Sequence, residues 1–356
     1  MNICFVLPRY LRVPSGGYKI VYEYANRMYK RGYSVSILNL NVGCLDNFPF
    51  NVPIIRKQLC DYFTKTEPKW FTLDKSIHQY SKYKHNIQKL IDKTDIAIAT
   101  SVETARETVE LFPCKKVYFI QDYENWHHDK DYVNKTFHLD MRHIVVSDWL
   151  KDVVDKNSTE SSLVIKNPIS TDEYTSIVRI DKRKKHTIGI LYHEGEYKGF
   201  KYSYQALKIL KNKYPDLEVI SFGTFDNPGF PDWVKFFKNA TKEQTIQIYN
   251  SVQVFLCGSV EEGYGLTGLE AMSCGAALVS SRYRGVLEYG IDGFNCILCP
   301  VKDPKALAEG VSYLFDNESK RLEISKNGIF SAKKFDWKIA EDKFDEALKK
   351  EFYQNT

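Results

Sequence analysis

Residues 259–275 read SVEEGYGLTGLEAMSCG and join an apolar, strand-like run to a helical pattern that begins near Leu266. The first N–H groups of such a helix have no partner inside it and lie at the positive end of its dipole, so they favour an anion. Gly263 and Gly265 carry no side chain and would let a ligand approach the backbone. The spacing therefore predicts a diphosphate site at this helix start.

Two carboxylates flank the predicted helix start, Glu262 before it and Glu270 inside it. Carboxylates repel phosphate, so they favour hydrogen bonds from the hydroxyl groups of a sugar or ribose. Alternatively, Glu262 only complements the helix dipole and Glu270 is a solvated helix residue. Gly263, Gly265 and Gly268 also match the dinucleotide fingerprint. That fingerprint belongs in the first strand–helix turn of a domain, whereas here it follows a third or fourth strand, which disfavours a dehydrogenase.

Strand-like apolar runs alternate with helical patterns in two successive series. This alternation predicts two parallel, doubly wound α/β sheets. The expected strands are 3–7, 34–40, 95–100, 116–121 and 143–146, and then 187–192, 217–222, 253–257, 276–280 and 295–298. The expected helices are 18–30, 102–111, 202–213, 242–250, 266–273, 304–315 and 337–352. Two such domains would place a ligand at the carboxyl ends of their strands.

Asn167-Pro168 interrupts the pattern between the two series. We expect an N-terminal domain over residues 1–167, a second domain over 168–336 and a C-terminal helix over 337–356. In this last segment Ala340, Phe344 and Leu348 recur every four residues and would share one helix face.

Composition limits the class of protein. Among the 356 residues, 43% are hydrophobic, which excludes intrinsic disorder, and no window reaches the ~18 unbroken apolar residues of a membrane span. The N-terminus MNICFVLP lacks the features of a signal peptide. The eight cysteines are scattered and fit a reduced interior, and the pair Cys296 and Cys299 has redox-like spacing but reads as buried thiols. We expect a soluble, cytoplasmic protein.

The net charge of +5 comes from the first half, because residues 1–166 hold 24 basic and 19 acidic side chains. No nucleic-acid-binding module is visible, so a nucleic acid partner is not expected. The tract 69–89 mixes five lysines with the aromatic residues Trp70, Phe71, Tyr80 and Tyr83. It is interpreted either as a solvated surface helix or as a segment that meets an anionic membrane.

The segment from Glu262 to Ser280 has two glutamates, Glu262 and Glu270, separated by seven residues and followed by AMSCGAALVS. This pattern resembles the donor-site signature of retaining glycosyltransferases of family 4, which have the GT-B fold. Other segments resemble that family in the same order, among them Ser15-Gly16-Gly17, residues 164–169, 284–288 and 292–295. The resemblance implies two Rossmann-like domains facing across a cleft, with the C-terminal helix returning to the first domain.

The resemblance implies a role for each matching residue of the second half. Glu270 would bind the nucleotide ribose, Glu262 the donor sugar, and Lys198 the diphosphate. The family usually has an arginine at the position of His193, so His193 would replace it if the diphosphate favours the charged imidazole. The remaining donor-binding residues implied are Gly263, Tyr264, Gly265, Leu266 and Thr267.

In the first half, Gly16 and Gly17 match the family's glycine loop. The segment Gln121-Asp122-Tyr123-Glu124 resembles a bacterial subset, rhamnosyltransferases that build surface glycans. Gln121 would bind substrate at the end of a strand. Asp122 and Glu124 would face the cleft there, where they either bind substrate or handle protons, or else only cap a loop.

Asp129-Lys130-Asp131, beside His127 and His128, imitates the metal-binding D-x-D of another glycosyltransferase fold. GT-B enzymes do not hold the diphosphate this way, so we expect neither a metal nor another cofactor. The predicted function is transfer of a sugar from a nucleoside-diphosphate sugar to a growing surface glycan, with retention of the anomeric configuration. The most specific form of this prediction names rhamnose as the sugar. The acceptor would be lipid-linked at the inner face of the cell membrane, with peripheral membrane contact. The alternatives are a nucleotide-sugar epimerase, a phosphorylase and a non-catalytic nucleotide-sugar-binding protein.

Overall fold

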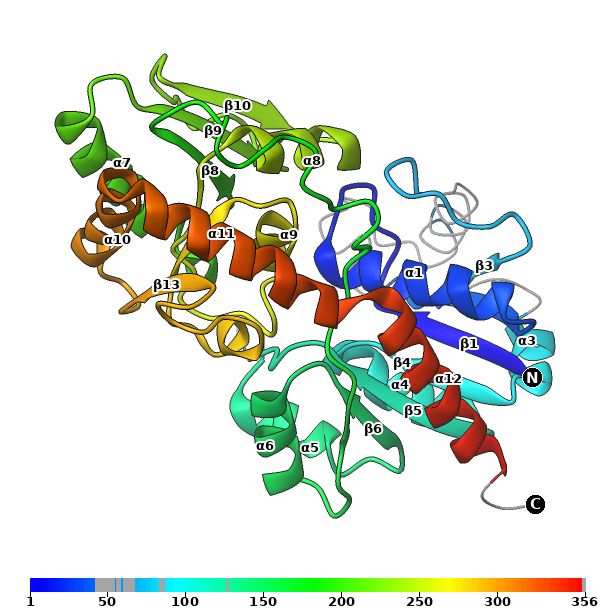
Figure 1. Ribbon diagram of the computed structural model, residues 1–356. Coiled ribbons are helices and arrows are strands. Elements are labelled where there is room, and N and C mark those ends of the chain that lie inside the picture. Colours follow the sequence, from blue (N-terminus) through cyan, green and yellow to red (C-terminus); the bar gives the residue numbers. More distant parts are fainter. Residues whose placement is uncertain (42–54, 56–58, 60–67, 83–86, 126–127, 354–356) are drawn as a thin grey trace. The chain divides into compact units, whose positions relative to one another are not determined.

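The computed structural model describes residues 1–41, 55, 59, 68–82, 87–125 and 128–353 (Figure 1). The chain divides into two compact units. The first comprises Met1–Ile165 and Glu341–Thr356, and the second comprises Lys166–Ala340. The sequence placed these divisions after residues 167 and 336.

The first unit is built on a parallel sheet with the strand order β3-β2-β1-β4-β5-β6-β7. Its strands are β1 (Asn2–Leu7), β2 (Ser34–Asn39), β3 (His78–Ser81), β4 (Ile96–Ala99), β5 (Lys115–Ile120), β6 (Arg142–Val145) and β7 (Leu163–Val164). Its helices are α1 (Gly16–Lys30), α3 (Ile87–Lys93), α4 (Val102–Leu111), α5 (Lys130–Thr136), α6 (Asp148–Lys156) and most of α12 (Trp337–Tyr353).

The second unit has a parallel sheet with the order β10-β9-β8-β11-β12-β13. Its strands are β8 (Thr187–Tyr192), β9 (Glu218–Gly223), β10 (Val234–Lys238), β11 (Val254–Cys257), β12 (Ala277–Ser281) and β13 (Cys296–Cys299). Its helices are α7 (Phe200–Lys213), α8 (Lys242–Ser251), α9 (Leu266–Ser273), α10 (Pro304–Asp316) and α11 (Glu318–Ala332), with short 3₁₀ turns η1 (Glu196–Lys198), η2 (Arg284–Glu288) and η3 (Lys333–Phe335).

Helices cover both faces of the second sheet. Val254 and Leu256 of β11 belong to a buried cluster with α7 and α10. Phe255, between them, points to the opposite face, where its ring lies 5.3 Å from that of Tyr249 on α8. Alternation of this kind, with apolar residues on both faces, is expected of a buried parallel sheet. The two doubly wound α/β sheets predicted from the sequence are confirmed.

The helix α12 packs on the first unit, as expected. Phe344 is fully buried, and its ring stacks on Tyr24 of α1 at a centroid distance of 4.2 Å and lies 5.8 Å from that of Phe119 on β5. At the end of α1, the Arg31 guanidinium donates to the carboxylates of Glu341, at 2.5 Å, and Asp345, at 3.0 Å. Apolar burial and ion pairs together hold α12 against α1.

The prediction of a surface helix over residues 69–89 is wrong in the part of this tract that is described. Residues 78–81 form β3, an edge strand beside β2, and α3 begins only at Ile87. The Trp70 indole N–H donates to the Leu11 carbonyl over 3.1 Å, and its ring lies 5.7 Å from that of Tyr22. Tyr83 lies outside the described residues. None of the helices within the described ranges is long and apolar enough to cross a bilayer.

Candidate active site

The loops after β8 and β11 meet where the strand order of the second sheet reverses, the place where doubly wound sheets bind ligands. The Val260 N–H donates to the Tyr197 carbonyl over 2.8 Å and joins the two loops. Gly199 has a φ of +56°, and a Cβ there would lie 1.9 Å from the Gly258 carbonyl oxygen. Only glycine permits this approach, so the backbone fixes the loop that carries Lys198 against the loop that leads to α9.

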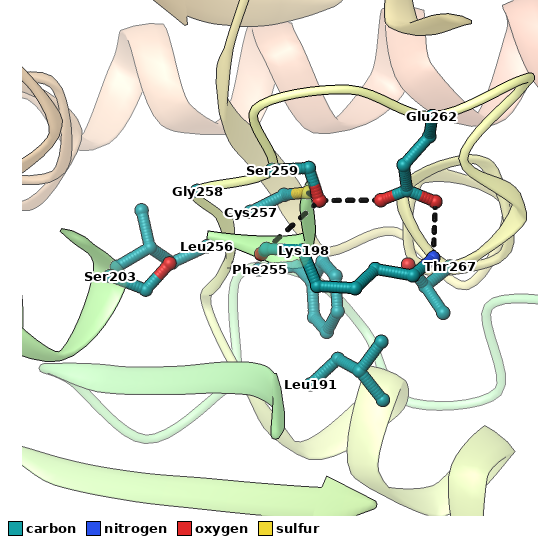
Figure 2. Close-up of a pocket in the computed structure, with 10 residues that line it drawn as sticks. All are labelled: Leu191, Lys198, Ser203, Phe255, Leu256, Cys257, Gly258, Ser259, Glu262 and Thr267. Carbon is teal, nitrogen blue, oxygen red and sulfur yellow. Dashed lines mark hydrogen bonds and ion pairs between the residues drawn. The ribbon is translucent and has the colours of Figure 1, made fainter. Parts of the chain in front are cut away.

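Lys198 and Glu262 form an ion pair, with Nζ 2.6 Å from Oε2 (Figure 2). The other carboxylate oxygen, Oε1, accepts a hydrogen bond from the Ser259 hydroxyl. Burial lowers the pKa of Lys198, but the Glu262 carboxylate raises it by more, and the pKa of the ammonium group lies above its usual value. Lys198 is therefore a cation at neutral pH.

The helix α9 begins with unpaired backbone donors. Gly265 precedes it with a φ of +86°, and a Cβ there would lie 2.0 Å from the Tyr283 hydroxyl oxygen, so the turn requires glycine. Within the described part of the chain, no acceptor is bonded to the N–H groups of Leu266 and Thr267. Thr267 and Lys198 line one small cavity (Figure 2). This helix start can therefore hold an anion next to a cationic side chain.

Gly263 and Tyr264 precede this helix start in the same loop. The Tyr264 side chain is 3% exposed, and its ring lies 5.7 Å from that of Tyr289. The Tyr289 hydroxyl in turn donates to the Gly265 carbonyl over 2.7 Å. Tyr264 thus packs beneath the helix start, and a binding role for it or for Gly263 stays a prediction.

Glu270 is buried on α9, with 6% of its surface exposed, so the interpretation of it as a solvated helix residue is wrong. The Tyr249 hydroxyl of α8 donates to Glu270 Oε2 over 3.1 Å. Burial raises the pKa of Tyr249, and the negative charge of Glu270 raises it further, which keeps the phenol protonated as a donor.

His193, at the end of β8, accepts a hydrogen bond at Nδ1 from the Gly195 N–H over 2.9 Å. Its ring lies 4.9 Å from that of Phe225 and 5.6 Å from that of Tyr197. Burial, and then the charge of Lys198, lower the pKa of His193 to about 4. The imidazole is therefore neutral at pH 7 with its proton on Nε2, and its protonation beside a diphosphate stays a prediction.

The first unit brings Gly17 and Gln121 together. Gly16 and Gly17 open α1, and a Cβ on Gly17 would lie 3.4 Å from Gln121 Oε1. That oxygen is buried, and within the described ranges it has no hydrogen-bond partner. A Cβ at Gly17 would thus make an ordinary van der Waals contact with Gln121, whose buried oxygen can accept a further hydrogen bond.

Asp122 and Glu124 follow β5. Asp122 Oδ1 accepts from the Tyr123 N–H, and Glu124 Oε2 accepts from the Val102 N–H at the start of α4, each over 2.8 Å. Burial raises the pKa of Glu124 to about 8, with a further contribution from Glu103. Glu124 thus accepts from a backbone donor at the start of α4. Roles of Asp122 and Glu124 in chemistry or binding stay predictions.

The D-x-D sequence of Asp129-Lys130-Asp131 lies at the start of α5. The Asp129 side chain accepts from the Tyr132 N–H and caps α5. No group of three or more potential metal ligands occurs among the residues that the structure describes, which exclude His127. Cys296 and Cys299 are buried on β13, and burial raises the pKa of each thiol to about 12. Both are therefore neutral at pH 7.

Sequence reasoning missed two supporting residues, Ser259 and Tyr249. Each donates a hydrogen bond to one of the two signature carboxylates. The position of Ser259, three residues before Glu262 in the same loop, was a usable signal. Tyr249 lies on a different helix from Glu270 and offered none.

Residues 176–330 match the family model "Glycosyl transferases group 1". An uncharacterized glycosyltransferase of Methanocaldococcus jannaschii is 23% identical over 227 residues, which are 54% of this chain and 55% of that protein. A Campylobacter jejuni N,N'-diacetylbacillosaminyl-diphospho-undecaprenol alpha-1,3-N-acetylgalactosaminyltransferase is 26% identical over 154 residues, which are 42% of this chain and 40% of that protein. The matches thus span about half the length of these curated relatives.

Solved structures resemble nearly the whole chain. Sucrose-phosphate synthase from Thermosynechococcus elongatus gives a TM-score of 0.76 at 13% identity, covering 99% of this chain and 100% of that one. Anabaena HepE in complex with UDP-glucose gives 0.74 at 14% identity, covering 98% of this chain and 99% of that one. At these identities the likeness establishes the fold. The chain therefore has the GT-B fold, and its residues 176–330 are similar to the group 1 glycosyl transferases.

Proposed function

We propose that this protein is a glycosyltransferase that moves a sugar from a nucleoside-diphosphate sugar to an acceptor hydroxyl. The observation that carries the proposal is the start of α9. There the N–H groups of Leu266 and Thr267 have no acceptor among the described residues, and Lys198 lines the same cavity as Thr267. A leaving diphosphate gains negative charge as its bond to the sugar breaks, and fixed donors of this kind stabilise such charge.

The roles of the carboxylates follow from this placement. Glu270, held by the Tyr249 hydroxyl, would accept from the ribose hydroxyls, and Glu262 from the donor sugar. We propose a front-face reaction with retention. The bond between the anomeric carbon and the phosphate oxygen breaks, the acceptor oxygen bonds to the same face, and the acceptor's proton passes to the leaving phosphate.

The acceptor we propose is a growing bacterial surface glycan on a lipid diphosphate, with rhamnose as the first sugar to test. Two observations support this choice: the Gln121–Glu124 segment, and the Campylobacter relative, whose name specifies an undecaprenol diphosphate acceptor. The enzyme would work at the inner face of the cell membrane, with its first unit on the acceptor side.

In the proposed peripheral contact with the membrane, exposed lysines would bind the anionic lipid surface. Lys69, Lys75 and Lys89 are exposed, whereas Lys82 pairs with Glu107 at 2.5 Å and Trp70 is held inside its unit. Each basic residue near an anionic surface contributes about 1 kcal/mol. We expect anionic vesicles to sediment more protein than neutral vesicles at low salt. Equal sedimentation would refute the membrane contact and leave the glycosyltransferase proposal standing.

The donor is tested by thermal shift across nucleotide sugars with different bases, because a ligand at 100 times its dissociation constant stabilises by about 2.7 kcal/mol. Transfer is then measured with the stabilising donor. Glu270→Gln keeps an acceptor oxygen for Tyr249 but removes the charge. This variant should cut the rate of transfer by roughly 10–150-fold, which is the factor that corresponds to the free energy of a hydrogen bond to a charged group.

Glu261→Gln is the matched control, because Glu261 lies in the same loop but pairs with Arg284 at the surface. Its turnover should match that of the unaltered protein. Stabilisation without transfer or donor hydrolysis would favour a non-catalytic binding protein. Release of a free epimer without acceptor would favour an epimerase.

A further inference from the structure

Ser259 contacts the Lys198–Glu262 pair without belonging to the signature that contains Glu262. It follows β11 and is 3% exposed. Its hydroxyl lies 2.5 Å from Glu262 Oε1 and 3.5 Å from the Lys198 carbonyl oxygen, as the dashed lines in Figure 2 show. A side chain enclosed to this degree has its hydrogen-bond direction decided by its neighbours.

The hydroxyl proton of Ser259 points to Glu262. A hydroxyl has one proton to donate, and the ionised carboxylate at 2.5 Å is the stronger and closer of the two acceptors. The Cys257 thiol, with its sulfur 3.4 Å away, donates a hydrogen bond to the Ser259 oxygen. Burial raises the pKa of Cys257, so this thiol is a donor at neutral pH.

The position of Ser259 is fixed by the sheet. The Ser281 hydroxyl, at the end of β12, donates to the Ser259 carbonyl. The preceding residue, Gly258, is in close backbone contact with Gly199. These contacts fix the backbone of Ser259, so its hydroxyl can follow a turning carboxylate only by changing its side-chain rotamer inside a buried site.

We propose that Ser259 is a positioning residue of the donor site: by holding Glu262 Oε1 it directs Oε2 to Lys198 and so sets where the lysine ammonium group lies beside the start of α9. The expected effect of Ser259 on diphosphate binding rests on the proposed function, whereas its effect on the Lys198–Glu262 ion pair does not. A glutamate with one oxygen released could rotate about its terminal torsion, which is broad. The ammonium group would then lose its fixed partner.

The first measurement needs no ligand. The ¹H–¹⁵N signal of the Lys198 ammonium group, assigned by its loss in Lys198→Met, should be sharp in the unaltered protein. In Ser259→Ala it should shift and broaden, and Ser259→Thr should restore it. The matched control is Ser203→Ala. Ser203 lines the same cavity and is also 3% exposed, but it bonds neither Glu262 nor Lys198 in the part of the chain that is described. An unchanged Lys198 signal in folded Ser259→Ala would overturn the proposal.

The second measurement is a double-mutant cycle on diphosphate binding, with inorganic pyrophosphate as the probe so that the nucleobase does not matter. Ser259→Ala should weaken binding about tenfold, the lower end for a hydrogen bond to a charged group. In a Glu262→Gln background it should change binding less than twofold, because a positioning residue acts through its partner. Equal losses in both backgrounds would show a direct or purely structural role and refute the inference. If the unaltered protein binds neither pyrophosphate nor any nucleotide sugar, the proposed function fails, while the ammonium signal still decides the role of Ser259.

Discussion

Replacing Lys198 by methionine tests whether the ion pair is as enclosed as its geometry indicates. Methionine keeps most of the length and apolar volume of lysine. Of the side-chain partners that Glu262 has within the described ranges, it leaves the Ser259 hydroxyl alone. The two side chains are 21% and 9% exposed and 2.6 Å apart. Removing one member of a buried pair costs roughly 3–5 kcal/mol because a charge is left uncompensated. Since solvent reaches a fifth of Lys198, we expect about 3 kcal/mol, the lower limit of that range.

For a unit of this size, 1 kcal/mol corresponds to about 2–4 °C in Tm, so Lys198→Met should lower the Tm of the second unit by about 6–12 °C. Thermal unfolding at pH 7 measures it, and adding Glu262→Gln should recover part of the loss by removing the stranded charge. The matched control is Lys201→Met. Lys201 pairs with Glu196 at 3.6 Å with both side chains exposed, a contact worth about 0–1 kcal/mol. Equal melting temperatures of the two lysine variants would refute an enclosed ion pair, and so would further destabilisation of Lys198→Met by Glu262→Gln.

Three further outcomes are expected. Gly265→Ala should unfold at lower temperature and lose nucleotide binding, because its Cβ would lie 2.0 Å from the Tyr283 hydroxyl oxygen. Calorimetry with a nucleotide sugar measures both effects. Undiminished binding would refute the requirement for glycine in this turn. The pKa of Glu124 is raised from 4.5 to about 8 in the folded protein, so folding retains a proton that the unfolded chain releases, and stability should fall as pH rises from about 4.5 to 8. Glu124→Gln should flatten that dependence in a Tm-versus-pH series, and an unchanged slope would contradict the assignment. Transfer should persist in EDTA, because Asp129 is a helix cap; loss in EDTA with recovery in Mn²⁺ would reveal a metal requirement.

The sequence predicted best the elements whose residues are buried on both sides. Strands such as β8 and β11 are nearly continuous apolar runs between turn residues, and their predicted bounds lie within one residue of those observed. The strands it missed lie at sheet edges. β10 reads VKFFK and β3 reads HQYS. Each pairs on one side only among the strands that the structure describes, so neither needs an apolar run.

The candidate site was predictable in its residues but not in its contacts. Lys198 and Glu262 were each identified by resemblance, yet they lie 64 positions apart, and their pairing depends on the crossover from β8 to β11. The burial of Glu270 likewise depends on Tyr249 of another helix. A carboxylate on an amphipathic helix pattern is read as solvated unless the partner that buries it is known, which is why the solvated interpretation stayed open.

The packing of α12 has a consequence for biosynthesis. Phe344 and Leu348 are fully buried in the first unit, although the ribosome makes them only after the whole second unit. At about 5–20 residues per second, the stretch from residue 165 to residue 344 takes about 10–40 s to translate. During that time the face of α1 that holds Tyr24 lacks its stacking partner. The unit that is synthesised first is therefore completed last, and until then the apolar face of α1 that α12 covers stays open to solvent.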